Sequence, residues 1–318
     1  MNEELVRAEE FIWPQKYRPQ KVDDCILPSE IKDVFKGFIK QGSLPNLLLY
    51  GQAGTGKTSV ARAALDELDC DYMFINGSKD SGIDTLRNRI SDFASSVSLV
   101  GGRKFIIIDE ADHLNANTTQ PALRGVMEEF SANCGFILTC NYVNRIIEPI
   151  RNSRCVNIEF ILPADEQPKL AMELFKRTQE ILKLEGVDYE KNSLIKLIKL
   201  YFPDFRRVLS ELQRHSVSGK IDDNVLKKTD IKIDGLLTTL REQDFKGMRS
   251  WVVANLNNDS TRIFRMIYDG LYDHIKPDQI PQVVLTLADY QHKAAFVADQ
   301  EINMVAFLTE LMAGEVVK

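Results

Sequence analysis

The sequence predicts an α/β fold with a mostly parallel central sheet, followed by two helical domains. In the first half of the chain, short β-rich apolar runs alternate with longer helix-like segments, a layout typical of parallel sheets with flanking helices. Phe105–Ile108 is apolar at every position, as expected of a strand that helices cover on both faces. After Pro163 such runs stop and helical periodicity follows. The predicted strands are residues 47–50, 73–75, 105–108, 136–140 and 156–160.

These changes of pattern divide the chain into three predicted domains. Residues 1–161 form the α/β domain with five parallel strands, residues 162–230 a small helical domain, and residues 231–318 a second all-helical domain. The linkers between them must be short, because no low-complexity segment separates the patterns.

Two helices in the later domains can be predicted in more detail. In the small domain, Asp204 can cap a helix whose apolar face consists of Phe205, Leu209 and Leu212. The last helix begins near Asp299. Its predicted buried residues are Ile302, Val305, Phe307 and Leu308.

Composition excludes several classes of protein. No segment is apolar enough to span a membrane, and the N-terminus lacks the apolar core of a signal peptide, so we expect a cytoplasmic protein without membrane contact. The five cysteines lack the spacing of zinc ligands, and we expect no metal besides nucleotide-bound magnesium. Because the net charge is -6, any contact with nucleic acid must come from a local basic patch.

Gly51–Thr58 reads GQAGTGKT and matches a phosphate-binding P-loop. It follows an apolar run and opens a helix-like segment, which is the context the motif requires. The glycines let backbone N–H groups converge on phosphate oxygens. Lys57 would reach the β- and γ-phosphates, and the Thr58 hydroxyl would complete a magnesium shell, so we expect ATP and Mg²⁺ rather than a simple glycine-rich turn. The predicted phosphate-binding residues are Gly54, Thr55, Gly56, Lys57, Thr58 and Ser59.

The predicted strand at Phe105–Ile108 runs into Asp109-Glu110-Ala111-Asp112. Acids at the carboxyl end of a buried strand lie where ligands bind in open α/β sheets. Asp109 is suited to hold magnesium, and Glu110 is suited to polarise the attacking water as the base. Alone, the motif is equally consistent with a solvated strand end. Together with the P-loop it predicts hydrolysis.

Three further polar residues have a functional and an ordinary interpretation. Asn141 follows the strand at 136–140 and could bind the attacking water or the γ-phosphate, or it could be a turn asparagine. Arg154, in Ser153-Arg154-Cys155, is predicted to lie far from its own P-loop and could serve a neighbouring copy's nucleotide, or form a surface salt bridge. Arg206, near the start of a helix, could reach phosphate or remain a solvated charge.

These motifs, with Trp13-Pro14-Gln15-Lys16-Tyr17-Arg18-Pro19, resemble clamp-loader subunits of the AAA+ ATPase class. The resemblance covers essentially the whole chain. It is greatest to the large subunits of T-even-type bacteriophage loaders, through Phe202–Arg206 and Asn133-Cys134-Gly135, with replication factor C small subunits the near alternative. Pro14 and the P-loop pair Gln52-Ala53 depart from the usual residues.

The resemblance implies an AAA+ module, a helical lid and a helical collar that holds several copies in a spiral. ATP would lie between adjacent subunits, Arg154 would act in trans, and Arg206 would match the lid arginine that contacts the γ-phosphate. The implied adenine-binding residues are Pro14, Gln15, Lys16, Tyr17 and Ile26.

The resemblance also implies partners. Ile83 and Arg87 would open a helix that faces primer–template DNA inside the spiral, and Arg124, with Gln120, would link DNA contact to the catalytic acids. A solvated helix face is the other interpretation of Arg87. The residues implied to grip a ring-shaped sliding clamp, or else to pack internally, are Val97, Leu99 and Val100.

The function that these features predict is the ATPase motor subunit of a sliding-clamp loader. Its partners would be further copies of itself, a distinct small subunit, the clamp and primer–template DNA. A non-hydrolysing scaffold subunit is one alternative, although Lys57, Thr58, Asp109 and Glu110 are all present. A helicase is another, but it would require a second α/β domain where the chain turns helical.

Overall fold

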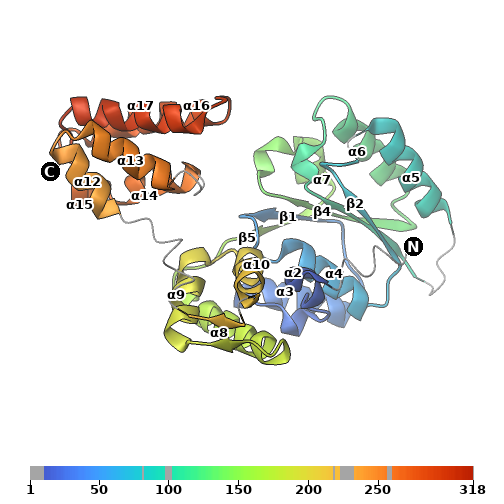
Figure 1. Ribbon diagram of the computed structural model, residues 1–318. Coiled ribbons are helices and arrows are strands. Elements are labelled where there is room, and N and C mark those ends of the chain that lie inside the picture. The colour runs from blue at the N-terminus through green and yellow to red at the C-terminus, as the bar shows by residue number, and fades with distance from the viewer. Residues whose placement is uncertain are drawn as a thin grey trace. The chain divides into compact units, whose positions relative to one another are not determined.

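The computed structural model forms two compact units, residues 1–225 and 226–318 (Figure 1). The structure describes residues 11–80, 82–96, 102–217, 219–222, 233–255 and 260–317. The first unit holds the large sheet and the second is helical. The predicted domains are 1–161, 162–230 and 231–318. The boundary after residue 161 divides the first unit further, and that division stays a prediction.

A five-stranded parallel sheet organises the first unit, as predicted. Its strands lie in the order β2-β3-β4-β1-β5, so β1 pairs with β4 and β5. The strands are β1 (Leu47–Gly51), β2 (Tyr72–Asn76), β3 (Lys104–Asp109), β4 (Cys134–Cys140) and β5 (Val156–Phe160).

Helices cover both faces of this sheet (Figure 1). Because side chains alternate along a strand, Leu47 and Leu49 join the core under α3 and α4, while Leu48 joins the core under α5, α6 and α7. This double burial explains why the central strands β1, β3 and β4 are apolar at successive positions. The helices are α3 (Ser29–Gln41), α4 (Lys57–Glu67), α5 (Ile83–Ser95), α6 (Thr119–Glu129) and α7 (Glu148–Ser153).

Short elements connect these layers. A four-residue helix, α2, precedes α3, and the short 3-10 helix η1 lies between them. Two further 3-10 helices, η2 and η3, follow β3 and β4 respectively. They are α2 (Trp13–Lys16), η1 (Val22–Asp24), η2 (Ala111–His113) and η3 (Val143–Arg145).

Among the described residues, three helices and a two-stranded sheet follow the large sheet within the first unit, and we call this part the lid. Asp204 caps α10 as predicted, because its Oδ1 accepts a hydrogen bond from Arg207 N at 3.0 Å. Of the predicted apolar face, Leu212 is buried and Phe205 and Leu209 are half-buried, and Val208, which was not predicted, is buried as well. The lid elements are α8 (Gln167–Leu184), β6 (Asp188–Tyr189), α9 (Lys191–Tyr201), α10 (Phe205–Ser216) and β7 (Lys220–Ile221).

The second unit is helical in its described residues, as predicted for the C-terminal domain. Asp299 caps α17 through hydrogen bonds from Glu301 N and Ile302 N. Phe307 and Leu308 are buried as predicted, but Ile302 is 68% exposed. The helices are α12 (Ile233–Arg241), α13 (Phe245–Asn255), α14 (Ser260–Asp269), α15 (Leu271–His274), α16 (Ile280–Ala294) and α17 (Gln300–Ala313). Within the described part of the chain, every helix is too short or too polar to cross a membrane.

Candidate nucleotide-binding site

The P-loop connects β1 to α4 at the carboxyl edge of the sheet. Gly54 and Gly56 have φ angles of 77° and 93°, which side-chain-bearing residues rarely adopt. Gly56 is the N-cap of α4, so Lys57, Thr58 and the half-buried Ser59 lie in the first turn of that helix. The loop therefore ends in a helix N-terminus, where unpaired N–H groups and the helix dipole favour an anion.

Lys57 is buried in the loop and is 8% exposed. Its Nζ donates to Gly51 O and Gln52 O, both at 2.8 Å, and to Asn141 Oδ1 at 3.1 Å. Burial lowers the pKa of Lys57 below the ordinary value of 10.5. The predicted lysine and the predicted asparagine are thus in direct contact, although they are far apart in the sequence.

Thr58 and Asp109 also meet, as the motif interpretation requires. The Thr58 Oγ1 donates to Asp109 Oδ1 at 2.6 Å. The same carboxylate oxygen accepts a hydrogen bond from Thr139 of the neighbouring strand β4. A hydroxyl and a carboxylate side by side are hard oxygen donors, which suit Mg²⁺ when phosphate oxygens and water complete the shell. Among the described residues, no group of three or more His, Cys, Asp and Glu could hold another metal.

Glu110 has an uncommon backbone conformation directly after β3. Its φ of 55° and ψ of 43° are left-handed, a region that residues other than glycine visit rarely. Glu110 N donates to Thr139 Oγ1 at 3.3 Å. A Cβ on Gly77, which follows the adjacent strand β2, would lie 2.7 Å from Glu110 O. The strand end is therefore fixed by close contacts on both sides.

Asp112 is a site residue to which the sequence interpretation gave no role. It is 6% exposed, and its Oδ2 accepts from Asn141 N at 3.3 Å and Tyr142 N at 3.1 Å. Among the described residues, its Oδ1 has no hydrogen-bond partner. Asp112 thus joins the acidic strand end to the loop that presents Asn141. The sequence signal for Asp112 was its position as the last acid of the motif. Thr139, which bonds Asp109 and Glu110, was also missed, and its signal was that it is the lone threonine in an apolar strand.

The lid contacts the P-loop through the start of α10. Phe205 N donates to Gly54 O at 3.2 Å, and a Cβ on Gly54 would lie 1.9 Å from Asp204 Oδ1. Arg206 follows in the first turn and is exposed, and its charge acts to lower the pKa of Lys57. By contrast, Arg207 lies over the ring of Tyr201, at 4.8 Å from its centroid.

The N-terminal segment holds the residues implied to bind adenine. Pro14, Gln15 and Lys16 belong to α2, and Tyr17 is its C-cap. Ile26 is half-buried. Next to it, Leu27 Cδ2 lies 3.6 Å from the position of a Cβ built on Gly56. The chain directly after Ile26 therefore reaches the P-loop, whereas the contacts of Lys16 and Tyr17 are with Glu185 of the lid.

Arg154 lies at the opposite edge of the sheet. It precedes β5, whose first residue Val156 pairs with Leu47 at the start of β1, whereas the P-loop follows the end of β1. Five strand residues span about 16 Å, so the structure keeps Arg154 away from the P-loop of its own chain. Its guanidinium forms an ion pair with Glu128 on α6.

The residues implied to bind DNA lie on α5 and α6, which pack against each other. Ile83 is 36% exposed at the first position of α5, and Arg87 is exposed one turn later. Arg124 is exposed on α6, whereas Gln120 is buried and bonds the carbonyls of Leu114 and Arg145. The predicted clamp-contact residues lie outside the described residues: Val97, Leu99 and Val100.

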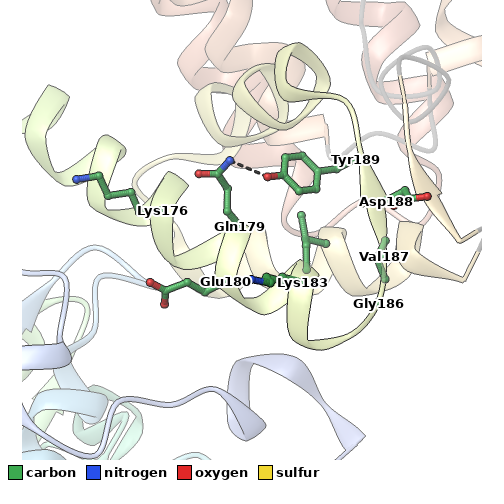
Figure 2. A pocket seen from close by; sticks show the side chains of 9 residues that line it. Lys176, Gln179, Glu180, Lys183, Gly186, Val187, Asp188 and Tyr189 are labelled. Atoms are coloured by element: carbon green, nitrogen blue, oxygen red, sulfur yellow. Dashed lines mark hydrogen bonds between the residues drawn. The ribbon is translucent and has the colours of Figure 1, made fainter.

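A cavity of about 710 Å³ lies elsewhere, in the lid. The second half of α8 and the turn into β6 line it, and Figure 2 shows Gln179 Nε2 donating to the Tyr189 hydroxyl across it, at 2.7 Å. None of the predicted site residues lines this cavity. It is not part of the P-loop site.

Two family models match the first unit. That of the AAA family, "ATPase family associated with various cellular activities", matches residues 47–163. That of the "Sliding-clamp-loader large subunit, AAA+ ATPase lid domain" matches residues 166–227.

Relatives match nearly the whole chain. The sliding-clamp-loader large subunit of Enterobacteria phage T4 is 33% identical and aligns with 96% of this chain and 97% of its own length. That of Escherichia phage RB69 is 34% identical with the same coverage. The replication factor C small subunit of Picrophilus torridus is 32% identical and aligns with 94% of this chain and 96% of its own length.

A solved structure has the same fold. It is the Thermotoga maritima RuvB Holliday junction branch migration motor, with a TM-score of 0.54 and 19% identity over 71% of this chain and 79% of that chain. At this identity the likeness concerns the fold alone.

Proposed function

Since this chain belongs to the AAA+ ATPase family of sliding-clamp loaders, we propose that it is the motor subunit that couples ATP to clamp opening. It is an ATP-hydrolysing AAA+ enzyme and a subunit of a sliding-clamp loader. In the proposed cycle, ATP binding assembles an open spiral that opens the clamp and holds primer–template DNA. Hydrolysis then releases the closed clamp on DNA.

The contact between Thr58 and Asp109 carries the chemical part of the proposal. The side-chain oxygens of these two residues lie 2.6 Å apart and would hold Mg²⁺ together with the triphosphate. The ion would neutralise phosphate charge. Lys57 binds the β- and γ-phosphates. Glu110 accepts a proton from the attacking water, and Asn141 orients that water or the γ-phosphate. Pro14–Tyr17 and Ile26 bind the base.

Two arginines complete the proposed site. Arg206 contacts the γ-phosphate from the lid, which is consistent with its place on α10 one residue after the bond between Phe205 N and Gly54 O. Arg154 acts in trans on the nucleotide of a neighbouring copy. Its position at the far edge of the sheet supports this role, because it leaves the P-loop of its own chain without that guanidinium.

The proposed partners follow the names of the relatives. We propose that further copies and a distinct small subunit form the loader, and that Val97, Leu99 and Val100 contact the ring-shaped clamp. The exposed Ile83, Arg87 and Arg124 would face primer–template DNA. Contacts of this kind follow phosphate positions rather than base sequence, so binding weakens steeply with salt. The host-cell cytoplasm is the proposed location.

The ATPase rate in four mixtures tests the proposal. The full chain and its partner subunit are assayed alone, with primed DNA, with a ring clamp, and with both, and Lys57→Ala serves as the inactive control. A loader gives a rate with both ligands that exceeds the sum of the two separate stimulations. Full stimulation by DNA alone would indicate a helicase. Binding of ATP without hydrolysis in any mixture would indicate a scaffold subunit.

A further inference from the structure

The short helix α2 depends on contacts from outside itself. A helix of four residues, Trp13–Lys16, does not persist alone, since nucleation of a helix is unfavourable. Its N-cap residue Ile12 gives no side-chain cap. Pro14 has no N–H group, and Gln15 N donates to Ile12 O at 2.8 Å. The N–H of Trp13 is then the remaining donor of the first turn that needs a partner.

Gln213 of the lid supplies that partner. Its Oε1 accepts from Trp13 N at 2.9 Å, and its Nε2 donates to Phe11 O at 2.6 Å. One carboxamide thus holds the backbone on both sides of Ile12, and α2 packs against α10.

A second lid residue holds the other end of α2. Glu185, the C-cap of α8, accepts hydrogen bonds from Lys16 Nζ at 2.7 Å and from the Tyr17 hydroxyl. Residues of the lid therefore hold the segment from Phe11 to Tyr17 at both of its ends.

The same helix α10 reaches the phosphate loop. Gln213 follows Arg206 by seven residues, which places both on one side of α10 about 10 Å apart. Phe205 N, next to Arg206, bonds Gly54 O of the P-loop. One rigid helix therefore touches the phosphate loop at its start and the segment proposed to bind the base near its end.

We propose that Gln213 is a positioning residue for the nucleotide base, with Glu185 in the same role at the other end of α2. This inference rests on the proposed function, in particular on base binding by Pro14–Tyr17. The lid holds α2 in place before ATP binds. Binding therefore does not include the cost of ordering that segment, and the affinity of the chain for ATP is higher. Movement of the lid at the phosphates also moves the base-binding segment.

The test compares a probe that has a base with one that has none. Affinities of the full chain for ATP and for inorganic tripolyphosphate are measured by calorimetry for wild type, Gln213→Ala and Gln179→Ala. The last is a matched control, because this lid glutamine bonds Tyr189 instead of α2. For Gln213→Ala we expect ATP binding about 5- to 30-fold weaker, corresponding to the loss of two hydrogen bonds. Tripolyphosphate binding should stay unchanged, as should both affinities of Gln179→Ala.

The fluorescence of Trp13 provides a second readout. The chain has two tryptophans, Trp13 and Trp251. In a Trp251→Phe background, emission reports Trp13, which is 5% exposed. Gln213→Ala should shift the emission to longer wavelength, as solvent reaches the ring. Gln213→Glu, which keeps the acceptor for Trp13 N and loses the donor to Phe11 O, should fall between wild type and Gln213→Ala in both measurements.

The outcomes separate the inference from the function on which it rests. Wild-type ATP affinity in both variants of Gln213 would overturn the inference and leave the ATPase proposal standing. An equal loss for ATP and tripolyphosphate would also overturn it, because Gln213 would then act on the phosphate side. A wild-type chain that binds neither probe would instead refute the proposed function.

Discussion

At the scale of single residues, Glu110 combines a catalytic candidate with an unusual backbone. A left-handed conformation at a residue other than glycine costs on the order of 1–3 kcal/mol and persists only where its surroundings impose it. Here the contacts with Thr139 and Gly77 impose it, at the end of the strand that presents Asp109. The strain thus falls at the residue that we propose as the base.

Replacing that base should separate binding from turnover. In Glu110→Gln the side chain keeps its size but cannot take a proton, so we expect wild-type ATP affinity and a hydrolysis rate reduced by about 10²- to 10⁴-fold. Calorimetry and a phosphate-release assay measure the two quantities. Near-normal turnover would remove Glu110 from the role of base.

A pH dependence should follow from Glu185. Hydrogen bonds from Lys16 and then Tyr17 lower the pKa of this carboxyl below 4.5. Because the folded-state pKa is the lower one, the stabilisation is present above pH 4.5 and is lost as the pH falls through the folded-state pKa. The Tm advantage of wild type over Glu185→Gln should therefore be largest near neutral pH and shrink below pH 4.5. Thermal unfolding at several pH values measures it, and a constant gap would contradict the linkage.

Candidate residues could be picked from the sequence where they belong to a local motif. The P-loop and the acidic strand end predicted that Thr58 and Asp109 both hold magnesium. The structure brings their side chains into contact, and the magnesium role stays a prediction. Asp112 and Gln213 were missed because their partners lie on other segments: the loop after β4 for Asp112 and α2 for Gln213. Nothing in the neighbouring sequence indicates which segments will meet in space.

At the scale of elements, the helix α10 determines how the lid meets the P-loop. Its cap, Asp204, satisfies Arg207 N and also lies against Gly54. Asp204→Ala removes the cap, and we expect the free energy of unfolding to fall by about 1 kcal/mol. Urea unfolding followed by circular dichroism measures the change.

A matched variant separates the cap from the charge. An asparagine side chain keeps an acceptor for Arg207 N but carries no charge, so Asp204→Asn should remain close to wild type in stability. If Asp204→Ala and Asp204→Asn lower the free energy of unfolding by the same amount, the charge of Asp204 rather than the capping bond stabilises the lid.

Elements differ in how well their sequence predicts them. The five strands were predicted to within about two residues. Continuous apolar runs mark the central strands, which are buried on both faces, whereas β5 alternates apolar and polar residues at the edge of the sheet. The strands β6 and β7 were missed, since two residues each give no period to detect. Ile302 was wrongly assigned to the core because α17 carries apolar residues around much of its circumference, and periodicity then does not identify the buried face.

At the scale of the whole molecule, the proposed site needs two copies of the chain. Arg154→Ala should abolish hydrolysis while ATP binding persists, and Lys57→Ala should abolish ATP binding. Mixing the two variants should restore part of the ATPase activity, because some pairs then join a wild-type P-loop to a wild-type Arg154. The measurement is the ATPase rate against mixing ratio. A mixture no more active than its components would argue for action of Arg154 within one chain.

The location of the phosphate loop and of Arg154 at opposite edges of the sheet gives each copy a direction. Copies joined through these edges line up head to tail, and such a row stays open unless its rotations add up to a full circle. An open row has one catalytic junction fewer than it has members. If Arg154 acts in trans as proposed, an arginine at one end of the row would meet no nucleotide, and a nucleotide at the other end would meet no arginine. A different kind of protein could occupy that last place without binding ATP, provided that it contributes a guanidinium.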